Sequence, residues 1–368
     1  MRRIAMFVAA STMTLSLAGC GVLNATGSST TATPTKGNDI TVGVLMPDKI
    51  NTRYTNFDYP IMKSKIAELT NNQGKVDYEN AASSASAQAK QMQKMIDDKV
   101  DVIILDSVDS HAIAGTVKKA KDAGIPVIAY DRLAEGPIDA YVSFDNELVG
   151  EVQARTLLEG LGSNVDSSDK VIMVNGSLTD PNAKQFKTGA VSELTGKVTI
   201  ADSYDTKDWD PVIAQQEVTR AINTIGKDNI AAVYSANDAM AGGVVKALKA
   251  AGVTSMPPIT GQDADLDAIH RILSGDQYMT VYKPYPDEAE AAAEMAVYKV
   301  QGKDIQFDAL TQDTVDSPTT KDIPAQLVQV NAVTKSKIKD TVVADGIYKI
   351  SQICTAAYKT ACAQAGLK

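Results

Sequence analysis

Short runs of β-branched and apolar residues alternate along this chain with amphipathic stretches of helical composition, and this alternation restricts the fold more than any other feature. The runs are ITVGVLM (40–46), KVDYEN (75–80), DVIILD (101–106), IPVIAY (125–130), KVIMVN (170–175), KVTIADS (197–203), NIAAVYS (229–235) and QYMTVY (277–282). They are nearly continuous apolar segments, as expected for strands buried on both faces. Repeated strand–helix units of this kind predict an α/β fold with doubly wound parallel sheets.

The chain contains too many strand–helix units for one compact sheet, and its 368 residues are enough for roughly two domains. We therefore expect two similar lobes joined by a hinge of several parallel strands. The predicted segments are an N-terminal lobe of residues 40–143 and 263–308, a C-terminal lobe of residues 144–262 and 309–345, and a C-terminal extension of residues 346–368. The strand–helix unit over 277–300 is expected to return to the first lobe. The stretch near 327–338 is expected to cross back to the second.

The first twenty residues, MRRIAMFVAASTMTLSLAGC, have the pattern of a secretory signal, in which two arginines precede an apolar stretch too short for a stable membrane span. The ending LAGC (17–20) resembles a bacterial lipobox. We expect residues 1–19 to be removed as a lipoprotein signal peptide and Cys20 to carry a lipid. An ordinary signal peptide with an incidental cysteine is the alternative. The Ser/Thr/Gly-rich residues that follow predict a flexible tether over 20–39.

Charge and composition exclude several classes of protein. The net charge of −9 argues against a nucleic-acid-binding protein, which would need a basic face. The two histidines, His111 and His270, lie far apart, and no Cys/His cluster has zinc spacing, so no metal site is predicted. The chain has no GxxxxGK[ST] loop, so any ATP hydrolysis would belong to a partner protein. No cofactor is expected.

Cys354 and Cys362 lie together in a C-terminal stretch of helical composition. Outside the cytosol such a pair is expected to form a disulfide, and two reduced thiols on one helix face are the alternative. Eight residues of one straight helix span about 12 Å, which is too far for a disulfide. If the bond forms, the segment must bend, as two short helices or a turn.

Polar side chains collect just beyond the predicted strands, where open α/β sheets bind their ligands. The candidate binding residues at these positions are Arg53, Tyr54, Asp131, Arg132, Asn182, Asn237, Asp263 and Lys283. Carboxylate, amide and guanidinium groups form paired hydrogen bonds with neighbouring hydroxyls, so the pattern favours a cleft for a neutral polyol. Asp131 and Arg132 could instead form a solvated pair in a loop, and Asn237 could simply cap a helix.

The single tryptophan, Trp209, lies in a loop before a predicted helix. A sugar ring has an apolar face of C–H groups, and Trp209 and Tyr54 could sandwich that face. Ordinary burial near the start of a helix is the alternative, because most tryptophans are partly in the core.

Six segments together resemble a known family. They are AYDR (129–132), SFDNELVGE (143–151), DPNAKQF (180–186), SANDAMAGG (235–243), GQDADLDAI (261–269) and TVYKP (280–284). They are similar to the type I periplasmic sugar-binding proteins of ABC importers, in the pentose/hexose branch, and resemble D-xylose-binding members most strongly. The resemblance extends over about residues 40–349. The extension with the two cysteines lies outside the usual family pattern.

The resemblance implies that an aldopyranose, first of all D-xylose, is held between the lobes and delivered to a membrane permease with its ATPase. The ligand contacts that it implies are Arg53, Tyr54, Asp131, Arg132, Asn182, Trp209, Asn237, Asp263 and Lys283. Xylose-binding members usually have tryptophan where this chain has Tyr54. This difference, with the first-loop string MPDKINTRY (46–54), keeps binding of glucose or of multiple sugars open. A lipid anchor implies an extracytoplasmic protein held at the cell membrane, in a Gram-positive-type envelope. We expect the protein to be a monomer.

Two other functional classes compete with sugar binding. A lipid-anchored glycosidase could use Asp131 and Asp263 as paired carboxylates. We expect no enzyme, because a cation or amide beside each cleft acid would keep it ionised, whereas a general acid needs a raised pKa. A sugar-responsive repressor would need an N-terminal helix-turn-helix, where this chain has a signal sequence. Signalling to a membrane sensor stays open beside transport.

Overall fold

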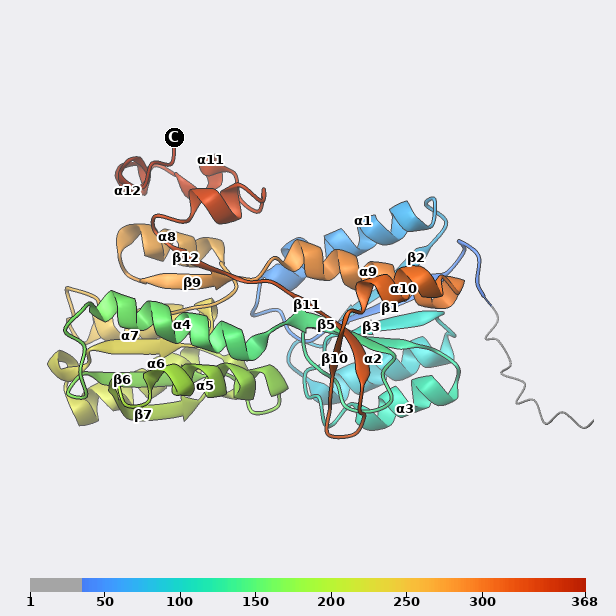
Figure 1. Ribbon diagram of the computed structural model, residues 1–368, viewed down its shortest axis with the longest axis horizontal. Helices are drawn as coiled ribbons and strands as arrows, with labels where there is room; N and C mark the ends of the chain where they lie inside the picture. The colour runs from blue at the N-terminus through green and yellow to red at the C-terminus, as the bar shows by residue number, and fades with distance from the viewer. Residues whose placement is uncertain (1–34) are drawn as a thin grey trace, which may run out of the picture. The chain divides into compact units, whose positions relative to one another are not determined.

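The structure is a computed structural model, and it describes residues 35–368. The predicted signal peptide (1–19), Cys20 and most of the predicted tether lie outside the described residues. The described part contains two lobes, each built on its own sheet (Figure 1).

The first lobe has a seven-stranded sheet with the order β10-β11-β5-β4-β3-β1-β2. Its strands are β1 (Thr41–Met46), β2 (Lys75–Asn80), β3 (Val102–Leu105), β4 (Val127–Tyr130), β5 (Ala140–Phe144), β10 (Asp313–Val315) and β11 (Ile323–Val328). All neighbouring pairs are parallel except β10 with β11. The apolar runs around β1, β3 and β4 are buried on both faces, as their continuous apolar sequence predicted. The prediction is wrong for β2 and for the run over residues 197–203, because both form edge strands whose residues are partly buried or exposed.

Helices cover both faces of this sheet (Figure 1). One face carries α1 (Tyr59–Leu69), preceded by the short turn η1 (Tyr54–Asp58), and α9 (Tyr285–Gln301), beside which lies α10 (Asp304–Leu310). The other face carries α2 (Ala85–Asp97) and α3 (Ala114–Asp122). Helix α9 follows from its sequence: Pro286 lies in its first turn, alanines fill its interior, and Gly302 ends it in a left-handed conformation.

The second lobe repeats this plan with fewer strands. Its strands are β6 (Lys170–Asn175), β7 (Thr199–Asp205), β8 (Ala232–Ser235), β9 (Met279–Tyr282) and β12 (Asn331–Thr334). Strands β7, β6 and β8 are parallel neighbours, and a bridge from Val233 to Ile259 continues the layer toward the antiparallel pair β9 and β12. Its helices are α4 (Asn146–Leu161), α5 (Pro181–Leu194), α6 (Pro211–Ile225), α7 (Asp238–Ala250) and α8 (Leu266–Ser274), with the short turns η2 (Lys207–Trp209) and η3 (Lys227–Asn229).

The helix starts beside the second sheet are fixed by capping side chains. Asp145, Asp180, Asp210 and Asn237 each accept a hydrogen bond from a backbone N–H in the first turn of α4, α5, α6 and α7 respectively. Such caps satisfy N–H groups that the helix cannot bond itself. Asp145 and Asn237 come within two residues of the strands β5 and β8, so these caps fix the loops at the carboxyl ends of both strands.

The chain crosses between the lobes at places that differ from the predicted boundaries. Strand β9 pairs with β12, and its Met279 and Val281 pack in the core of the second lobe, so assigning all of residues 263–308 to the first lobe was wrong. Helix α9 does lie on the first lobe, as predicted. Strands β10 and β11 belong to the first sheet, so the assignment of residues 309–345 to the second lobe holds only from β12 onward. The crossings therefore follow β5, β9 and β11.

The end of the chain forms a small cap on α8. After η4 (Lys339–Val343), the helices α11 (Ile350–Ile353) and α12 (Lys359–Gln364) flank the disulfide between Cys354 and Cys362, which confirms the predicted bend into two short helices. The His270 ring of α8 stacks on Tyr358 with 4.1 Å between ring centroids. We call residues 350–368 the C-terminal cap.

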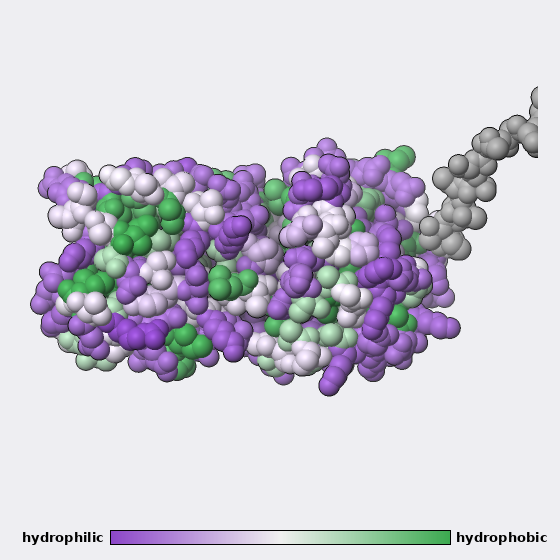
Figure 2. All heavy atoms as spheres, turned by 90° about the horizontal axis from the view of Figure 1, so that it is seen from below, coloured by the Kyte–Doolittle hydropathy of each residue, from purple (hydrophilic) through white to green (hydrophobic). Residues whose placement is uncertain are grey.

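The visible surface is mainly hydrophilic, with apolar residues in separate small patches (Figure 2). Within residues 35–368, no helix has the length and apolar character that a membrane crossing requires.

Candidate functional site

A small cleft lies between the two lobes, at the carboxyl ends of their strands. The lining residues are Asp48, Ile50, Asn51, Tyr54, Asp131 and Arg132 from the first lobe, Asp180, Asn182, Phe186, Trp209, Asn237, Gln262 and Asp263 from the second, and Lys283 from the crossing after β9. Every predicted binding residue except Arg53 lines this cleft.

Asp131 is the central acceptor of the first lobe. It follows β4 with a positive φ of 55°, and the hydroxyls of Tyr141 and Ser143 hold this turn by donating to its backbone carbonyl at 2.7 Å. Burial alone would raise the pKa of its carboxyl, but the charges of Lys283 and Arg53 hold that pKa below its usual value. Asp131 is therefore an ionised acceptor. A non-glycine residue in this conformation is strained, and such strain is common at binding sites.

Arg53 lies behind Asp131 rather than in the cleft, which differs from its predicted role as a ligand contact. Its side chain is 2% exposed and is held by Asp58 (Nε–Oδ2, 2.8 Å) and Glu288 (Nη2–Oε2, 2.6 Å). Its Nη1 lies 3.0 Å from Asp131 Oδ2. The guanidinium therefore positions the Asp131 carboxylate and keeps it charged.

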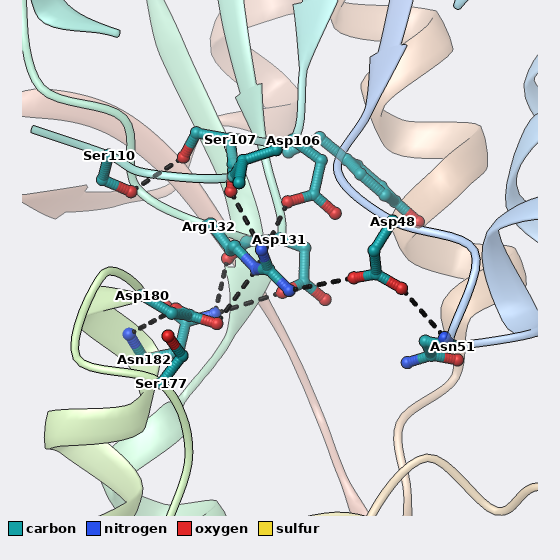
Figure 3. A network of polar contacts seen from close by, with 12 residues as sticks. Asp48, Asn51, Asp106, Ser107, Ser110, Asp131, Arg132, Ser177, Asp180 and Asn182 are labelled. Carbon is teal, nitrogen blue, oxygen red and sulfur yellow. Dashed lines mark hydrogen bonds and ion pairs between the residues drawn. The ribbon is translucent and has the colours of Figure 1, made fainter. Parts of the chain in front are cut away.

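Arg132 forms the densest polar network in the cleft (Figure 3). Its Nε lies 2.9 Å from Asp180 Oδ2 of the second lobe, and its Nη1 donates to the Ser107 carbonyl at 3.0 Å. Two further carboxyl groups lie near the guanidinium: Asp48 Oδ2 is 3.5 Å from Nη2, and Asp106 Oδ1 is 3.6 Å from Nε. The Arg132–Asp180 ion pair joins the two lobes, so the structure shows the cleft closed.

Asp106 is fully buried beneath this network and does not line the cleft. Burial raises the pKa of its carboxyl well above the usual range, and the nearby charge of Arg132 opposes only part of that shift. Asp180 and Asp48 are the carboxylates nearer to Arg132, at 2.9 and 3.5 Å.

Lys283 lies between two aspartates of the cleft, Asp131 and Asp263. Its Nζ is 3.1 Å from Asp263 Oδ1 and 3.6 Å from Asp131 Oδ2. Burial alone would lower the pKa of Lys283, but the charges of Asp131 and Asp263 raise it above its usual value. Asp263, which has a positive φ of 98°, also accepts from Asn51 Nδ2 at 3.0 Å across the lobes. These charges hold several donors and acceptors in fixed places.

Three buried polar atoms of cleft-lining residues have neither a hydrogen-bond partner nor an ion-pair partner within residues 35–368. They are Asn182 Oδ1, Trp209 Nε1 and Gln262 Oε1. Asn182 uses its Nδ2 to donate to the Asp131 carbonyl at 2.9 Å, and Asn237 uses its Oδ1 to cap α7. Buried polar groups are nearly always bonded. The unused valences therefore indicate a polar ligand with both donors and acceptors.

Aromatic side chains form the apolar walls of the cleft. Trp209 is 8% exposed, and it and Asp208 have positive φ values of 57° and 55°. Phe186 of α5 packs edge-on against the indole, with 6.2 Å between the ring centroids and an interplanar angle of 71°. Tyr54 contributes an aromatic ring from the first lobe. Such rings pack well against the C–H face of a sugar.

The sequence prediction did not name Phe186, Asn51, Asp48, Asp180 and Gln262 as ligand contacts. Asp48, Asp180 and Gln262 come after predicted strands, so their positions in the sequence indicated that they could lie in the cleft. Phe186 stands at the end of the DPNAKQF segment, and its place on α5 one turn beyond Asn182 was the only hint of its role. Asn51 gave no signal, because its contact with Asp263 depends on how the lobes meet.

No group of three or more His, Cys, Asp or Glu side chains in the described part of the chain is arranged to hold a metal ion. The cleft lining combines carboxyl, amide and cationic side chains, which together suit a neutral ligand rich in hydroxyl groups.

Comparison with known proteins gives a consistent assignment. A family model described as a periplasmic binding protein domain matches residues 42–304. The chain is 37% identical over 285 residues to the D-xylose-binding periplasmic protein of Escherichia coli (strain K12), covering 76% of this chain and 83% of that protein. It is 30% identical over 336 residues to a multiple sugar-binding periplasmic receptor of Rhizobium radiobacter, covering 85% and 92%.

Solved structures agree with this match. The structure of an ABC transporter solute-binding protein from Clostridium phytofermentans, with bound β-D-glucose, has a TM-score of 0.77 and 26% identity. The match covers 85% of this chain and 99% of that one. The two-lobed fold, the interlobe cleft and these matches together show that the chain belongs to the periplasmic binding protein family, with the type I fold of ABC sugar-binding proteins.

Proposed function

We propose that this protein captures an aldopyranose, D-xylose above all, and delivers it to an ABC import permease. The observation that carries the proposal is the closed cleft itself, in which ionised carboxylates, cations and amides with unused valences surround a space walled by aromatic rings. Two relatives named as D-xylose-binding proteins, at 37% and 35% identity, support the choice of sugar.

The two lobes divide the proposed contacts between them. The first lobe would supply Tyr54, Asp131 and Arg132, and the second would supply Asn182, Trp209, Asn237 and Asp263, with Lys283 at the crossing between them. Hydrogen bonds between neutral groups contribute about 1 kcal/mol each, and those to charged groups about 1.5–3 kcal/mol. Several charged bonds with aromatic stacking are sufficient for micromolar affinity, which corresponds to about 8 kcal/mol. The sugar binds one lobe first, and closure adds the contacts of the other.

Glucose, or several sugars, is the second candidate ligand. Tyr54 stands where xylose-binding members usually have tryptophan, and a multiple sugar-binding relative and a glucose-bound structural neighbour both match over most of the chain. A smaller aromatic platform discriminates less by stacking, so a broader range of sugars is the expected consequence.

We also propose that the protein is a lipoprotein held outside the cell membrane through Cys20, delivers its sugar to a permease and its ATPase, and acts as a monomer that can also serve a membrane sensor. The LAGC segment at 17–20 supports the anchor. Cys20→Ala should release the protein from the membrane fraction into the medium, and retention of this variant in the membrane would contradict a lipid anchor on Cys20.

A panel of sugars tests the proposed ligand. D-xylose, glucose, arabinose, galactose and ribose would each be titrated calorimetrically into the purified protein, and the thermal midpoint would be recorded with each. A ligand that binds only the native state raises this midpoint by mass action. We expect D-xylose to give the tightest binding and the largest rise. Binding of none of these sugars, or hydrolysis of xylobiose by the protein, would contradict the proposal.

A further inference from the structure

Gly176, the residue that follows β6, packs directly against the ring of Trp209. A Cβ atom added at Gly176 would lie 2.1 Å from Cη2, 2.2 Å from Cζ2 and 2.6 Å from Cζ3 of the indole. These distances are far below the 3.4 Å at which ordinary van der Waals contact begins. The φ angle of Gly176 lies outside the left-handed region, so the backbone does not require glycine here. The close approach of the ring is the reason that no side chain fits.

The added carbon would lie over the face of the indole, because it is nearly equidistant from consecutive atoms of the six-membered ring. One face of the indole therefore rests on the backbone at Gly176, and the ring presents its remaining surface to the cleft that it lines.

Other contacts prevent the ring from turning away. The positive φ values of Asp208 and Trp209 fix the turn that carries it, and Phe186 packs edge-on against it. A protein interior packed this closely responds to the addition of a single carbon atom. A side chain at residue 176 must therefore push the indole by roughly 1 Å, toward the cleft, or displace strand β6.

We propose that Gly176 is a positioning residue for Trp209, and that its missing side chain sets how deeply the aromatic wall extends into the sugar cleft. This inference rests on the proposed function, because Trp209 is taken to stack on the bound sugar. Aromatic stacking and hydrogen bonding on one rigid ligand require their partners in fixed places, and a misplacement of about 1 Å is enough to weaken binding strongly.

The single tryptophan makes the inference directly measurable, since all tryptophan fluorescence of the protein comes from Trp209. We would compare wild type, Gly176→Ala and the control Gly115→Ala, whose added Cβ in α3 meets nothing within 4 Å. For Gly176→Ala we expect a shifted emission maximum without sugar and at least tenfold weaker binding in calorimetry. For Gly115→Ala we expect neither change.

A second pair of variants separates a positioning role from a general loss of stability. In the Trp209→Phe background the smaller ring leaves room for a methyl group, so adding Gly176→Ala should weaken binding by less than threefold. If residues 176 and 209 are in direct contact, the effects of the two substitutions on the binding free energy should not add. If Gly176→Ala alone does not fold, the comparison of Trp209→Phe with the double variant still tests the contact.

The outcomes separate this inference from the proposed function. If the wild type binds no sugar, the proposed function fails, while the emission of Gly176→Ala still reports on the contact. If the wild type binds sugar and Gly176→Ala keeps both its affinity and its emission maximum, the inference is overturned. An equal loss of affinity in the wild-type and Trp209→Phe backgrounds would also overturn it.

Discussion

At the scale of single residues, the main feature of the cleft is a buried lysine between two aspartates. Lys283 lies within 3.6 Å of both Asp131 and Asp263, and their charges raise the pKa of its ammonium group above the usual value. Groups held in this way present fixed charges to a ligand without first having to reorganise. Removing one partner of such a buried group is costly, because the remaining charge loses its counter-ion.

Asp263→Asn should weaken sugar binding about tenfold. The substitution keeps the shape of the side chain and tolerates the positive φ of this position, but it replaces charge-assisted hydrogen bonds with weaker neutral ones. It also leaves Lys283 with only Asp131 as a close counter-charge among the described residues. Titration calorimetry measures the loss.

Asp267→Asn is the matched control for this substitution, since Asp267 is exposed in the first turn of the neighbouring helix α8. It should leave the affinity unchanged. Equal affinities for wild type and Asp263→Asn would remove Asp263 from the binding site.

Most of the cleft residues can be located from the sequence by the rule that ligands bind beyond strand ends. Asp131, Arg132 and Lys283 follow predicted strands, and the structure places them in the cleft lining. The same rule does not distinguish Arg53 from its neighbour Tyr54. A helical turn, η1, begins at Tyr54, and the two adjacent side chains point in different directions. Tyr54 lines the cleft, whereas Arg53 lies behind Asp131.

At the scale of secondary structure, the C-terminal cap lies beyond the residues 42–304 that the family model matches. Its disulfide joins the end of α11 to the interior of α12. Its apolar side chains join a cluster with α8 and with Tyr282 and Tyr285 beside the crossing after β9. The cap contributes no residue to the cleft lining. We therefore assign it to stability rather than to sugar recognition.

Replacing both cysteines, with Cys354→Ser and Cys362→Ser together, should lower the thermal midpoint by several degrees. Closing a loop of this length stabilises a fold by about 2–3 kcal/mol through the entropy of the unfolded chain. Differential scanning calorimetry measures the shift, and reductant should reproduce it in wild type. Sugar affinity should change by less than threefold. A large loss of affinity would show instead that the cap acts on the neighbouring crossing.

Most strands were predictable from the apolar runs of the sequence, whereas β5, β10, β11 and β12 were not. Each of the eight runs overlaps a strand, and these include the edge strands β2 and β7. Strands β10, β11 and β12 have mixed composition, so periodicity does not distinguish them from loops. Strands β11 and β12 are defined by pairing with β5 and β9, which lie far away in the sequence.

At the scale of the whole described molecule, the two lobes meet through several polar contacts that surround the cleft. Beside the Arg132–Asp180 ion pair, the Thr52 hydroxyl of the first lobe donates to Asp265 of the second at 3.4 Å. Burial, together with the nearby charge of Asp263, raises the pKa of Asp265 to about 7. Asp265 is therefore a group of this interface whose charge changes near neutral pH.

The raised pKa of Asp265 predicts that stability falls as pH rises. The native state binds this proton more tightly than the unfolded chain, so its contribution is complete below about pH 4 and is lost as pH rises through about 7. The thermal midpoint should therefore be higher at pH 5 than at pH 8. Asp265→Asn should reduce this difference, as scanning calorimetry would show.

The groups around Asp265 define the control for this experiment. Arg271 opposes the shift, while Asp267 and Asp263 add to it, and the buried Asp238 carboxylate accepts from the Asp265 backbone N–H at 3.0 Å. Asp267→Asn removes one of these charges from an exposed site and should largely retain the pH dependence. If Asp265→Asn and wild type have the same pH dependence, Asp265 is not the group responsible.

Two lobes and a hinge were predictable from the number of strand–helix units, but the crossing points were not. The sequence around β9 contains an apolar strand followed at once by a helix, which resembles a unit of one lobe. In the structure the chain leaves the second lobe between them, at Lys283 and Pro284. Which sheet a strand joins depends on the packing of distant residues such as Met279 and Val281, and no local pattern records this.

The three crossings lie next to one another. At the first lobe, the last residues of β5 and β11, Phe144 and Val328, are paired. At the second lobe, the last residue of β9, Tyr282, pairs with the first residue of β12, Asn331. A hinge made of adjacent paired strands is expected to bend about a single axis and to resist sliding or twisting of one lobe against the other. We expect opening and closing to follow one path, along which Asn182 returns to Asp131 and Asp180 returns to Arg132. Selection among sugars would then depend on the shape of the closed cleft.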